Sequence, residues 1–328
     1  MTEAAIALNG VTKRYGDVVA LERIDLQVPP GTVFGLLGPN GAGKTTAVRI
    51  LTTIIPPDEG SARVLGFDVV RQADAVRDRI GLAGQYAAVD ENLTGRENLR
   101  LIGRLTHLPR ALVAERASEL LERFGLSDAA DRPVRTYSGG MRRRLDLAAA
   151  LVHRPPVLFL DEPTTGLDLR SRRELWAVIG ELVAEGMTLL LTTQYLEEAD
   201  KLADRIAVVD GGRVVAEGTA AELKAGVGTT VLEVGLRDED EAERAEPVLG
   251  RFGVTPPERD GSLVRLEVDD GPRVLMGLLG GLGGAGLTPV SVVIREPSLD
   301  DVFLALTGRR VEAGPAEPNR SLSSRGAA

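Results

Sequence analysis

The sequence contains no cysteine, and His107 and His153 are its only histidines. Without cysteine there is no disulfide framework, no thiolate metal site and no cysteine nucleophile, which fits a reducing compartment. The two histidines lie far from each other along the chain, so a histidine-based metal cluster is not expected. These absences argue against both disulfide and histidine–metal chemistry.

An excess of basic residues is also missing, because the formal net charge is −9. Binding to a nucleic-acid backbone needs a concentrated basic surface, so nucleic acid is not expected to be the main partner, although local basic patches are possible. The first residues, "MTEAAIALNG", have no basic region followed by an apolar core. We therefore expect no secretory signal and a cytoplasmic location.

Long uninterrupted apolar segments are absent as well. From Val274 to Ile294 the chain carries no charged side chain, but this stretch contains repeated glycines and Pro289. These residues lower the hydrophobicity and break a helix. The pattern predicts the end of a helix, a glycine turn and the strand "PVSVVI" in preference to a membrane span.

Residues 1 to about 220 alternate apolar strand-like runs with helical stretches. The runs "TVFGLLG", "PVLFLD", "TLLLTT" and "RIAVVD" are almost continuously apolar, as expected of parallel strands that are covered on both faces. Residues 87 to about 150 have no strong strand pattern and are predicted to be helical. The sequence therefore predicts an α/β domain with a helical insertion.

A different pattern follows from about 221 to 310, where strand-like and helical stretches alternate over a short length. It predicts a small α+β domain. Residues 311–328, "VEAGPAEPNRSLSSRGAA", are rich in Pro, Gly, Ala and Ser and have few core residues. We predict that this tail is disordered.

The first chemical motif is "GPNGAGKTT", of the form G-x-x-x-x-G-K-T, between a predicted strand and a predicted helix. Its glycines let successive N–H groups turn inward around phosphate oxygens, next to the positive end of the helix. The lysine supplies charge to the outer phosphates, and the first threonine supplies a hydroxyl to Mg²⁺. A simple glycine turn is the alternative. The predicted P-loop residues are Gly38, Asn40, Gly41, Gly43, Lys44, Thr45 and Thr46.

The second motif, "PVLFLDEPTTGLD", is an apolar strand that ends in adjacent carboxylates. Asp161 is placed to hold Mg²⁺, and Glu162 is placed to polarise an attacking water. A lone aspartate after a buried strand is commonly just an acidic turn, but the pair together with a phosphate loop indicates hydrolysis of a nucleotide.

The third motif is "YSGG", which precedes an amphipathic helix and makes a second anion-binding helix start. A single nucleotide site has no evident use for two anion-binding helix starts, the phosphate loop and "YSGG", unless two subunits meet at the site. With these motifs in this order, the chain resembles the ATP-binding subunit of an ABC transporter over most of residues 4–220. The resemblance implies a P-loop NTPase fold of the ABC type, ATP and Mg²⁺ as ligands, and Ser138, Gly139 and Gly140 closing over the ATP of the opposite protomer.

The resemblance assigns further residues. Tyr15 matches the aromatic that stacks on adenine, although a tyrosine alone would be an ordinary surface residue. Gln85 matches the glutamine that senses Mg²⁺ and the γ-phosphate, and Asp168 matches a loop that crosses the dimer interface. In "TLLLTTQYLEEAD", Gln194 occupies the place where the family usually has a histidine that contacts the γ-phosphate. An amide keeps an N–H donor but never gains a charge, so we expect Gln194 to tune hydrolysis that depends on Glu162.

Together with "REPSLDDVFLALTG", these motifs resemble a narrower group, the ATP-binding subunits of bacterial drug exporters of the daunorubicin-resistance type. This implies a separate integral-membrane permease, a homodimer on ATP binding, and a place at the cytoplasmic face of the membrane. A soluble ABC-type ATPase and a nucleotide-dependent switch are the alternatives. For the run Arg142–Arg144, a solvated helix face is favoured over phosphate binding.

Overall fold

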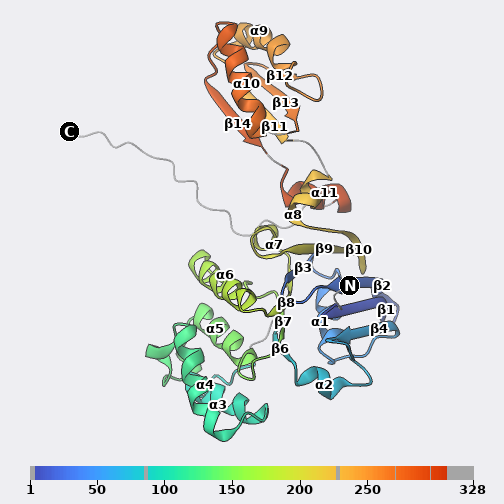
Figure 1. Cartoon of the computed structure of the whole chain (residues 1–328), viewed down its shortest axis with the longest axis vertical. Helices are drawn as coiled ribbons and strands as arrows, with labels where there is room; N and C mark the ends of the chain where they lie inside the picture. The colour runs from blue at the N-terminus through green and yellow to red at the C-terminus, as the bar shows by residue number, and fades with distance from the viewer. Residues whose placement is uncertain (1–3, 85–87, 227–229, 270, 296, 309–328) are drawn as a thin grey trace, which may run out of the picture. The chain divides into compact units, whose positions relative to one another are not determined.

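A computed structural model describes residues 4–84, 88–226, 230–269, 271–295 and 297–308. The chain forms two compact units (Figure 1). One contains the chain up to Glu217, and the other spans Gly218–Arg309. Each unit is described separately below.

A six-stranded sheet forms the centre of the first unit, in the order β10-β9-β3-β8-β7-β6. From β9 to β6 the paired strands are parallel. This confirms the predicted α/β fold. The strands are β3 (Val33–Leu37), β6 (Ile80–Ala83), β7 (Val157–Asp161), β8 (Thr188–Thr193), β9 (Arg205–Asp210) and β10 (Arg213–Gly218).

Both faces of this sheet are buried, because successive side chains enter different cores. In β7, Phe159 packs into one hydrophobic cluster, whereas Leu158 and Leu160 pack into the other. The first cluster joins the sheet to helix α1 (Lys44–Leu51) and to an antiparallel sheet of order β2-β1-β4-β5. The strands of this second sheet are β1 (Ile6–Tyr15), β2 (Val18–Val28), β4 (Glu59–Val64) and β5 (Phe67–Asp68), with the short α2 (Ala73–Arg77) after them.

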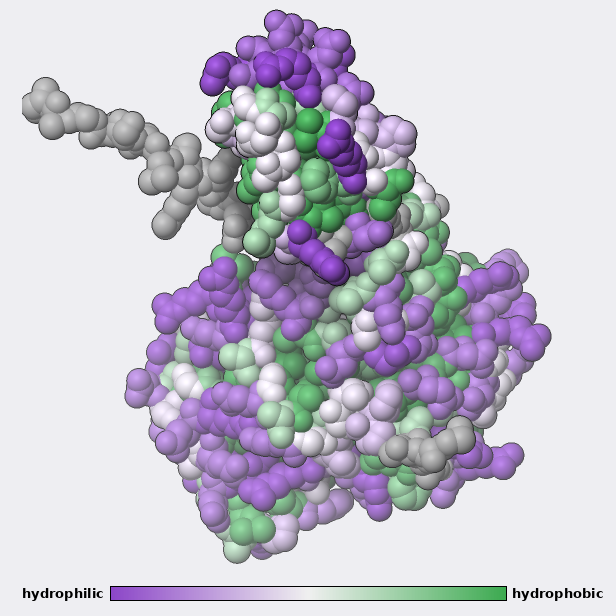
Figure 2. Space-filling model, turned by 45° about the horizontal axis from the view of Figure 1, so that its top comes forward, coloured by the Kyte–Doolittle hydropathy of each residue, from purple (hydrophilic) through white to green (hydrophobic). Residues whose placement is uncertain are grey.

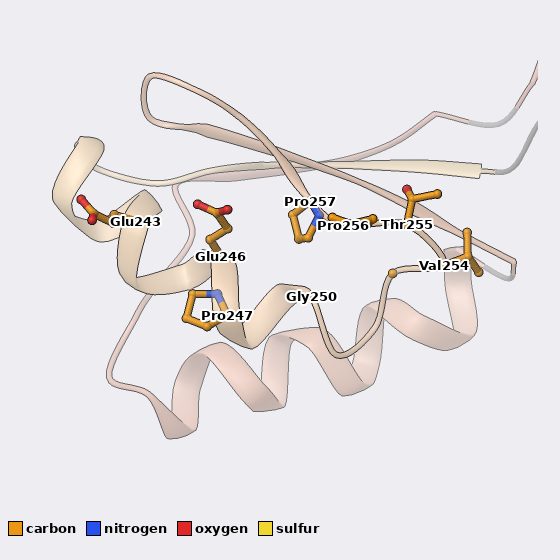
Figure 3. A pocket seen from close by; sticks show the side chains of 9 residues that line it. Glu243, Glu246, Pro247, Gly250, Val254, Thr255, Pro256 and Pro257 are labelled. Atoms are coloured by element: carbon orange, nitrogen blue, oxygen red, sulfur yellow. The ribbon is translucent and has the colours of Figure 1, made fainter.

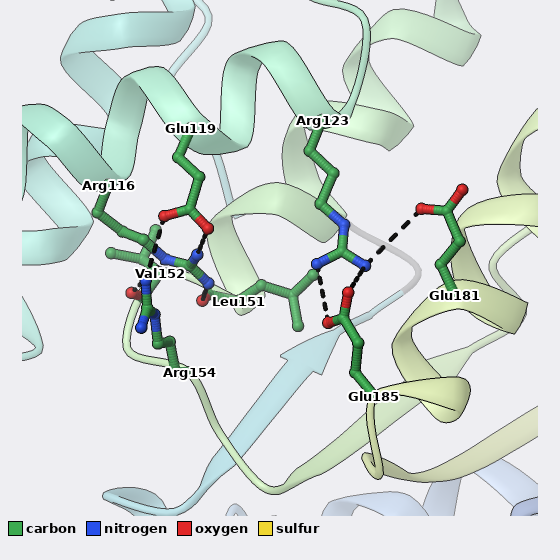
Figure 4. A network of polar contacts seen from close by, with 8 residues as sticks. All are labelled: Arg116, Glu119, Arg123, Leu151, Val152, Arg154, Glu181 and Glu185. Atoms are coloured by element: carbon green, nitrogen blue, oxygen red, sulfur yellow. Dashed lines mark hydrogen bonds and ion pairs between the residues drawn. The ribbon is translucent and has the colours of Figure 1, made fainter.

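Helices cover the opposite face (Figure 1). They are α3 (Gly95–Leu105), α4 (Arg110–Arg123), the 3-10 turns η1 (Ser127–Ala129) and η2 (Val134–Thr136), α5 (Gly139–Ala150), α6 (Leu169–Ala184) and, after β8, α7 (Leu196–Leu202). Two arginines of α4 connect it to the neighbouring elements (Figure 4). Arg123 pairs with Glu181 of α6 and with Glu185, which follows that helix, and Arg116 donates to the carbonyls of Leu151 and Val152.

The second unit contains an antiparallel sheet of order β12-β13-β11-β14, whose buried side chains pack against α9 and α10. The charge-free stretch noted above forms most of α10, a turn and β14. No helix in the described part of the chain is both long and apolar enough to span a bilayer. The elements are α8 (Ala220–Ala225), β11 (Thr230–Gly235), α9 (Glu239–Leu249), β12 (Glu258–Asp260), β13 (Leu263–Val268), α10 (Gly271–Gly284), β14 (Ser291–Arg295) and α11 (Leu299–Thr307).

An open groove of about 540 Å³ lies between α9 and the loop that leads to β12. Glu243 and Glu246 line its helical side, and Pro256 and Pro257 line its loop side (Figure 3). Glu246 also pairs with Arg259. On the face drawn in Figure 2, hydrophilic residues cover most of the surface and hydrophobic ones form small patches.

Candidate functional site

The site is built at the carboxyl ends of the parallel strands. Strands β3, β8, β7 and β6 are neighbours in the sheet, so the segments that follow them lie along one edge. These segments carry the phosphate loop after β3, Gln194 after β8, Glu162 after β7 and Gly84 after β6. Four segments that are far apart in the sequence therefore meet at one edge.

The phosphate loop has three positions that favour glycine, one of which is Gly41 with φ 81°. A Cβ on Gly38 would lie 2.2 Å from the carbonyl oxygen of Val209, and Gly43 has φ 107° where it precedes α1. The backbone thus packs against β9 and then turns into the helix, which leaves the N–H groups at the start of α1 available to an anion. Asn40 and Gly41 are exposed on this loop, and Thr46 is half-buried.

Lys44 lies within the loop and is only 4% exposed. Its Nζ donates to the carbonyls of Gly38 at 2.7 Å and Pro39 at 3.0 Å, and it lies 3.6 Å from Glu162 Oε1. Burial lowers the pKa of Lys44, while the charges of Glu162 and Asp161 oppose this shift. The lysine is therefore held at the mouth of the loop, next to the carboxylate expected to act on water.

Asp161 is 4% exposed and accepts two hydroxyl hydrogen bonds on Oδ1. Thr45 donates to it at 3.1 Å and Thr192 at 2.5 Å. No group of three or more acidic, His or Cys side chains that could hold a metal was found in the described ranges. Mg²⁺ in nucleotide sites binds few carboxylates and takes its other ligands from phosphates, hydroxyls and water, so the adjacent Thr45 and Asp161 fit it.

Glu162 has an unusual backbone conformation for a non-glycine residue, with φ 50°. Its N–H donates to both the carbonyl and the hydroxyl of Thr192 at 3.1 Å, which fixes it to the end of β8. Such conformations cost about 1–3 kcal/mol and persist where the surrounding structure holds them. In this conformation Glu162 Oε1 lies 3.6 Å from Lys44 Nζ.

Gln194 follows β8 directly and is half-buried. Among the described residues, its side chain makes no hydrogen bond. The next residue is fixed more firmly, since the N–H of Tyr195 donates to Thr193 Oγ1 at 2.9 Å and Arg172 lies 5.0 Å from the Tyr195 ring. The Gln194 amide therefore has a donor to offer to a ligand.

Ser138 and Asp168 cap the helices α5 and α6. Ser138 Oγ accepts from the N–H of Met141 at 3.2 Å, and Asp168 Oδ1 accepts from the N–H of Ser171 at 2.7 Å. The latter bond lowers the pKa of Asp168. Ser138, Gly139 and Asp168 are exposed, and no hydrogen bond or ion pair within the described ranges joins them to the phosphate loop of the same chain.

Two further residues were predicted to bind the nucleotide or its metal ion, Tyr15 and Gln85. Tyr15, at the end of β1, is 47% exposed, and the ring lies 5.9 Å from Lys13 Nζ. It therefore presents an aromatic face to solvent. Gln85 lies outside the described residues.

The interpretation of Arg142–Arg144 as a solvated helix face was wrong for Arg143. Arg142 pairs with Glu91 and Arg144 with Glu174. The Arg143 side chain is 12% exposed and bonds to the backbone on either side of Glu162. Sequence reasoning missed this residue and its partner Asp146, because helical spacing alone does not distinguish a buried arginine from a solvated one.

Glu198 was also missed. It lies on α7, is 1% exposed and accepts a hydrogen bond from Trp176 Nε1 at 3.2 Å. Its second carboxylate oxygen has no hydrogen-bond partner in the described structure. Burial raises the pKa of Glu198 above the usual value near 4.5, although the side chains of Thr193, Trp176 and Thr164 and, more weakly, the charge of Arg172 act in the opposite direction.

The raised pKa of Glu198 predicts a pH-dependent stability. A carboxyl whose pKa is raised on folding stabilises the fold below the unfolded pKa, near 4.5, and this contribution is lost as the pH rises through the folded value. We expect Glu198→Gln, which stays neutral, to be more stable than the unmodified chain at about pH 8 but not at about pH 4.5. The gain should be roughly 1.4 kcal/mol for each tenfold increase in the proton affinity of the carboxylate on folding.

Urea unfolding of Glu198→Gln and the unmodified chain at the two pH values measures this gain. The exposed neighbour Glu197, changed to Gln, is the control. A pH-independent difference for Glu198→Gln would contradict the assignment.

Comparisons with known proteins agree on the family. A family description of ABC transporters matches residues 21–165, and one of the C-terminal domain of DrrA1-3-like ATP-binding proteins matches residues 218–307. The chain is 56% identical to the daunorubicin resistance ATP-binding protein DrrA3 of Streptomyces coeruleorubidus, over 95% of this chain and 99% of that protein. It is 53% identical to the daunorubicin/doxorubicin resistance ATP-binding protein DrrA of Streptomyces peucetius, over 93% and 92%.

A more distant relative is the Nod factor export ATP-binding protein I of Cupriavidus metallidurans, at 41% identity over 94% of this chain and 99% of that protein. Among solved structures, a dimeric ATP-binding cassette in a post-hydrolysis state with ADP and Pi aligns with a TM-score of 0.60 at 26% identity, over 65% of this chain and 98% of that chain. With the phosphate loop, the strand-end carboxylates and these relatives taken together, the chain belongs to the family of ABC transporter ATP-binding subunits, and its activity is ATP hydrolysis.

Proposed function

We propose that this chain powers export of a hydrophobic drug or antibiotic through a separate integral-membrane permease, on the cytoplasmic face of the membrane. The relatives above 50% identity are named for resistance to daunorubicin or doxorubicin, and they match along nearly the whole chain, including the C-terminal unit. Nucleic acid is not a partner in this proposal. The relative that is 41% identical to this chain is named for export of a different compound, Nod factor.

One observation carries the catalytic part of the proposal. Glu162 Oε1 lies 3.6 Å from Lys44 Nζ. This contact is at the carboxyl edge of the sheet, where the phosphate loop follows β3 and Asp161 is the last residue of β7. A carboxylate beside the phosphate loop is placed to accept a proton from water that attacks the γ-phosphate. Lys44 then exchanges its bonds to the Gly38 and Pro39 carbonyls for bonds to phosphate oxygens.

The remaining residues of the site hold ATP and Mg²⁺. Thr45, Asp161 and Gln85 would hold the ion, which neutralises the β- and γ-phosphate charge when bound. The N–H groups of Gly41, Gly43 and Thr46 receive the phosphates, Asn40 lies at the loop tip, and Tyr15 stacks on adenine. Gln194 donates its amide N–H to the γ-phosphate.

The site is completed by a second copy of the chain. Ser138 and Gly139 are exposed at the start of α5, Gly140 is half-buried, and none of the three is bonded to its own phosphate loop in the described structure. They are therefore placed to meet the γ-phosphate of the opposite protomer. The exposed Asp168 crosses the same interface. Two ATP molecules would thus close a homodimer, and hydrolysis would reopen it.

Exchanging Gln194 tests its role as a phosphate contact. A lost neutral hydrogen bond is worth about 0.5–1.5 kcal/mol, so Gln194→Ala should lower kcat by roughly 2- to 12-fold. Gln194→His should retain or raise kcat, because a protonated imidazole donates a stronger, charge-assisted bond. Steady-state phosphate release measures both, with the exposed Gln72→Ala as control. Equal rates for Gln194→Ala and the unmodified chain would remove Gln194 from the site.

Export is tested in the organism that encodes the chain. Cells in which Glu162 is replaced by Gln should accumulate more fluorescent daunorubicin than cells with the unmodified chain. The chain should also sediment with membranes. The alternatives, a soluble ABC-type ATPase and a nucleotide-dependent switch, predict unchanged accumulation, and the switch additionally predicts no phosphate release.

A further inference from the structure

Arg143 and Asp146 form a buried ion pair that the catalytic scheme above does not use. They lie one turn apart on α5, with Arg143 Nη1 3.1 Å from Asp146 Oδ2. The two side chains are 12% and 1% exposed. A buried charge is costly unless it is paired and hydrogen-bonded, so the further contacts of the pair indicate what it holds.

The contacts of Arg143 converge on the backbone around the catalytic carboxylate. Nε donates to the carbonyl of Pro163 at 2.8 Å, and Nη2 donates to that of Asp161 at 3.4 Å. These two residues flank Glu162 in the sequence. Nη1 donates to the carbonyl of Gly84, at the end of β6, at 2.5 Å. One planar guanidinium therefore connects the segments that follow two neighbouring strands.

Asp146 extends this connection. Its Oδ1 accepts from the N–H of Ala88 at 2.7 Å, while Oδ2 pairs with Arg143. The pair thus binds Gly84 and Ala88 on one side and Asp161 and Pro163 on the other. A lysine has a single nitrogen and cannot donate in the same plane to all of these carbonyls at once.

Glu162 needs such support because of its own conformation. With φ 50°, it has a strained backbone, which is held by Thr192 from β8 on one side. Arg143 holds the carbonyls of its neighbours from the other side. Displacement of a reacting group by about 1 Å can cost about 10²-fold in rate.

We propose that Arg143, paired with Asp146, is a positioning residue that sets the placement of the Glu162 carboxylate for ATP hydrolysis. This deepens the proposed function and rests on its assignment of Glu162. The pair acts through Glu162, and neither side chain touches the nucleotide. Because Arg143 follows Ser138–Gly140 on the same helix, the pair also ties the helix start that meets the partner's nucleotide to the catalytic edge of its own protomer.

The test compares two similar arginines. Arg116 on α4 is 11% exposed, pairs with Glu119 three residues further on, and donates to the carbonyls of Leu151 and Val152 at the C-terminal end of α5 (Figure 4). Within the described ranges it makes no hydrogen bond to the residues on either side of Glu162. Arg116→Lys therefore also removes a guanidinium that donates to two backbone carbonyls, and it controls for the packing that is lost with such a group. Arg143→Lys should lower kcat by about 10- to 100-fold with nearly unchanged affinity for ATP, whereas Arg116→Lys should change thermal stability to a similar extent and kcat little.

A double-mutant cycle separates positioning from general damage. In a Glu162→Gln background, Arg143→Lys should cause little further loss of the residual rate, because the group that it positions is already removed. Asp146→Asn keeps an oxygen that accepts from Ala88 N–H but loses the charge that pairs with Arg143, so it should also lower kcat. This variant replaces Arg143→Lys in the test if Arg143→Lys does not fold. Full kcat in Arg143→Lys, or equal losses of kcat in the two arginine variants, would overturn the positioning role of Arg143 but leave the proposed function standing. No turnover by the unmodified chain would remove the proposed function as well.

Discussion

Replacing Glu162 with Gln should lower ATP turnover by the purified chain by about 10²- to 10⁴-fold while leaving ATP binding nearly unchanged. The amide keeps the shape and the reach of the side chain but cannot accept a proton from water. The backbone bonds from Glu162 N–H to Thr192 do not involve the side chain, so the fold of the site should be retained.

Because ATP is bound but not hydrolysed, the Glu162→Gln variant should also accumulate as a dimer when ATP and Mg²⁺ are present. Size-exclusion chromatography with light scattering measures this, and phosphate release measures the rate. Glu181→Gln, on the helical face and paired with Arg123, is the matched control that should keep the normal rate. Glu162→Gln with full turnover would exclude Glu162 as the base.

The second large effect is expected from Gly139→Asp, which should abolish the ATP-dependent dimer formed in the Glu162→Gln background. Gly139 is exposed at the first position of α5, and a Cβ there meets no atom within 4 Å. A carboxylate at a helix N-terminus favours the helix through the macrodipole, so folding should not suffer. The new charge would, however, meet the γ-phosphate of the opposite protomer and repel it.

The monomer provides the internal check on this prediction. Since Gly139 has no bond to its own phosphate loop in the described structure, ATP binding by the Gly139→Asp monomer should be nearly normal, as measured with a fluorescent ATP analogue. Gly180→Asp, at an exposed glycine of α6 that also has free space for a side chain, is the matched control. A Gly139→Asp protein that still dimerises on ATP would place the start of α5 outside the interface.

The parallel strands and the phosphate loop could be predicted from the sequence because their signals are local. Continuous apolar runs such as "VLFLD" indicate strands buried on both faces, and the phosphate loop begins at Gly38, directly after such a run. Strand-end carboxylates then have to meet the loop at one edge of the sheet. The alternation of strand-like and helical stretches from about 221 to 310 likewise predicted the mixed α and β content of the second unit.

The antiparallel sheet of the first unit was not predicted, although part of its signal is present. The buried residues Leu21, Ile24, Leu26 and Val28 of β2 alternate with exposed ones toward the end of the strand, which is a period-2 pattern. Register shifts in the β1–β2 pair interrupt this pattern earlier in the strands. The pairing of a hairpin to β4, distant in sequence, is set by tertiary packing.

The buried polar groups were the least predictable part of the site. Arg143 lies in a run of arginines, and only the carbonyls at the ends of β6 and β7 determine that its side chain is buried. Glu198 similarly appears in an acidic run, and its burial depends on Trp176 of another helix. These contacts join segments that are distant in the sequence, so the spacing of residues within one helix does not predict them.

The most direct test of the central claim is the rate of phosphate release by the purified, unmodified chain with ATP and Mg²⁺, set beside Glu162→Gln in the same assay. The account predicts turnover that requires Mg²⁺ and falls by about 10²- to 10⁴-fold in the variant, together with an ATP-bound dimer. Absence of turnover in the unmodified chain, or equal turnover in both proteins, would contradict it.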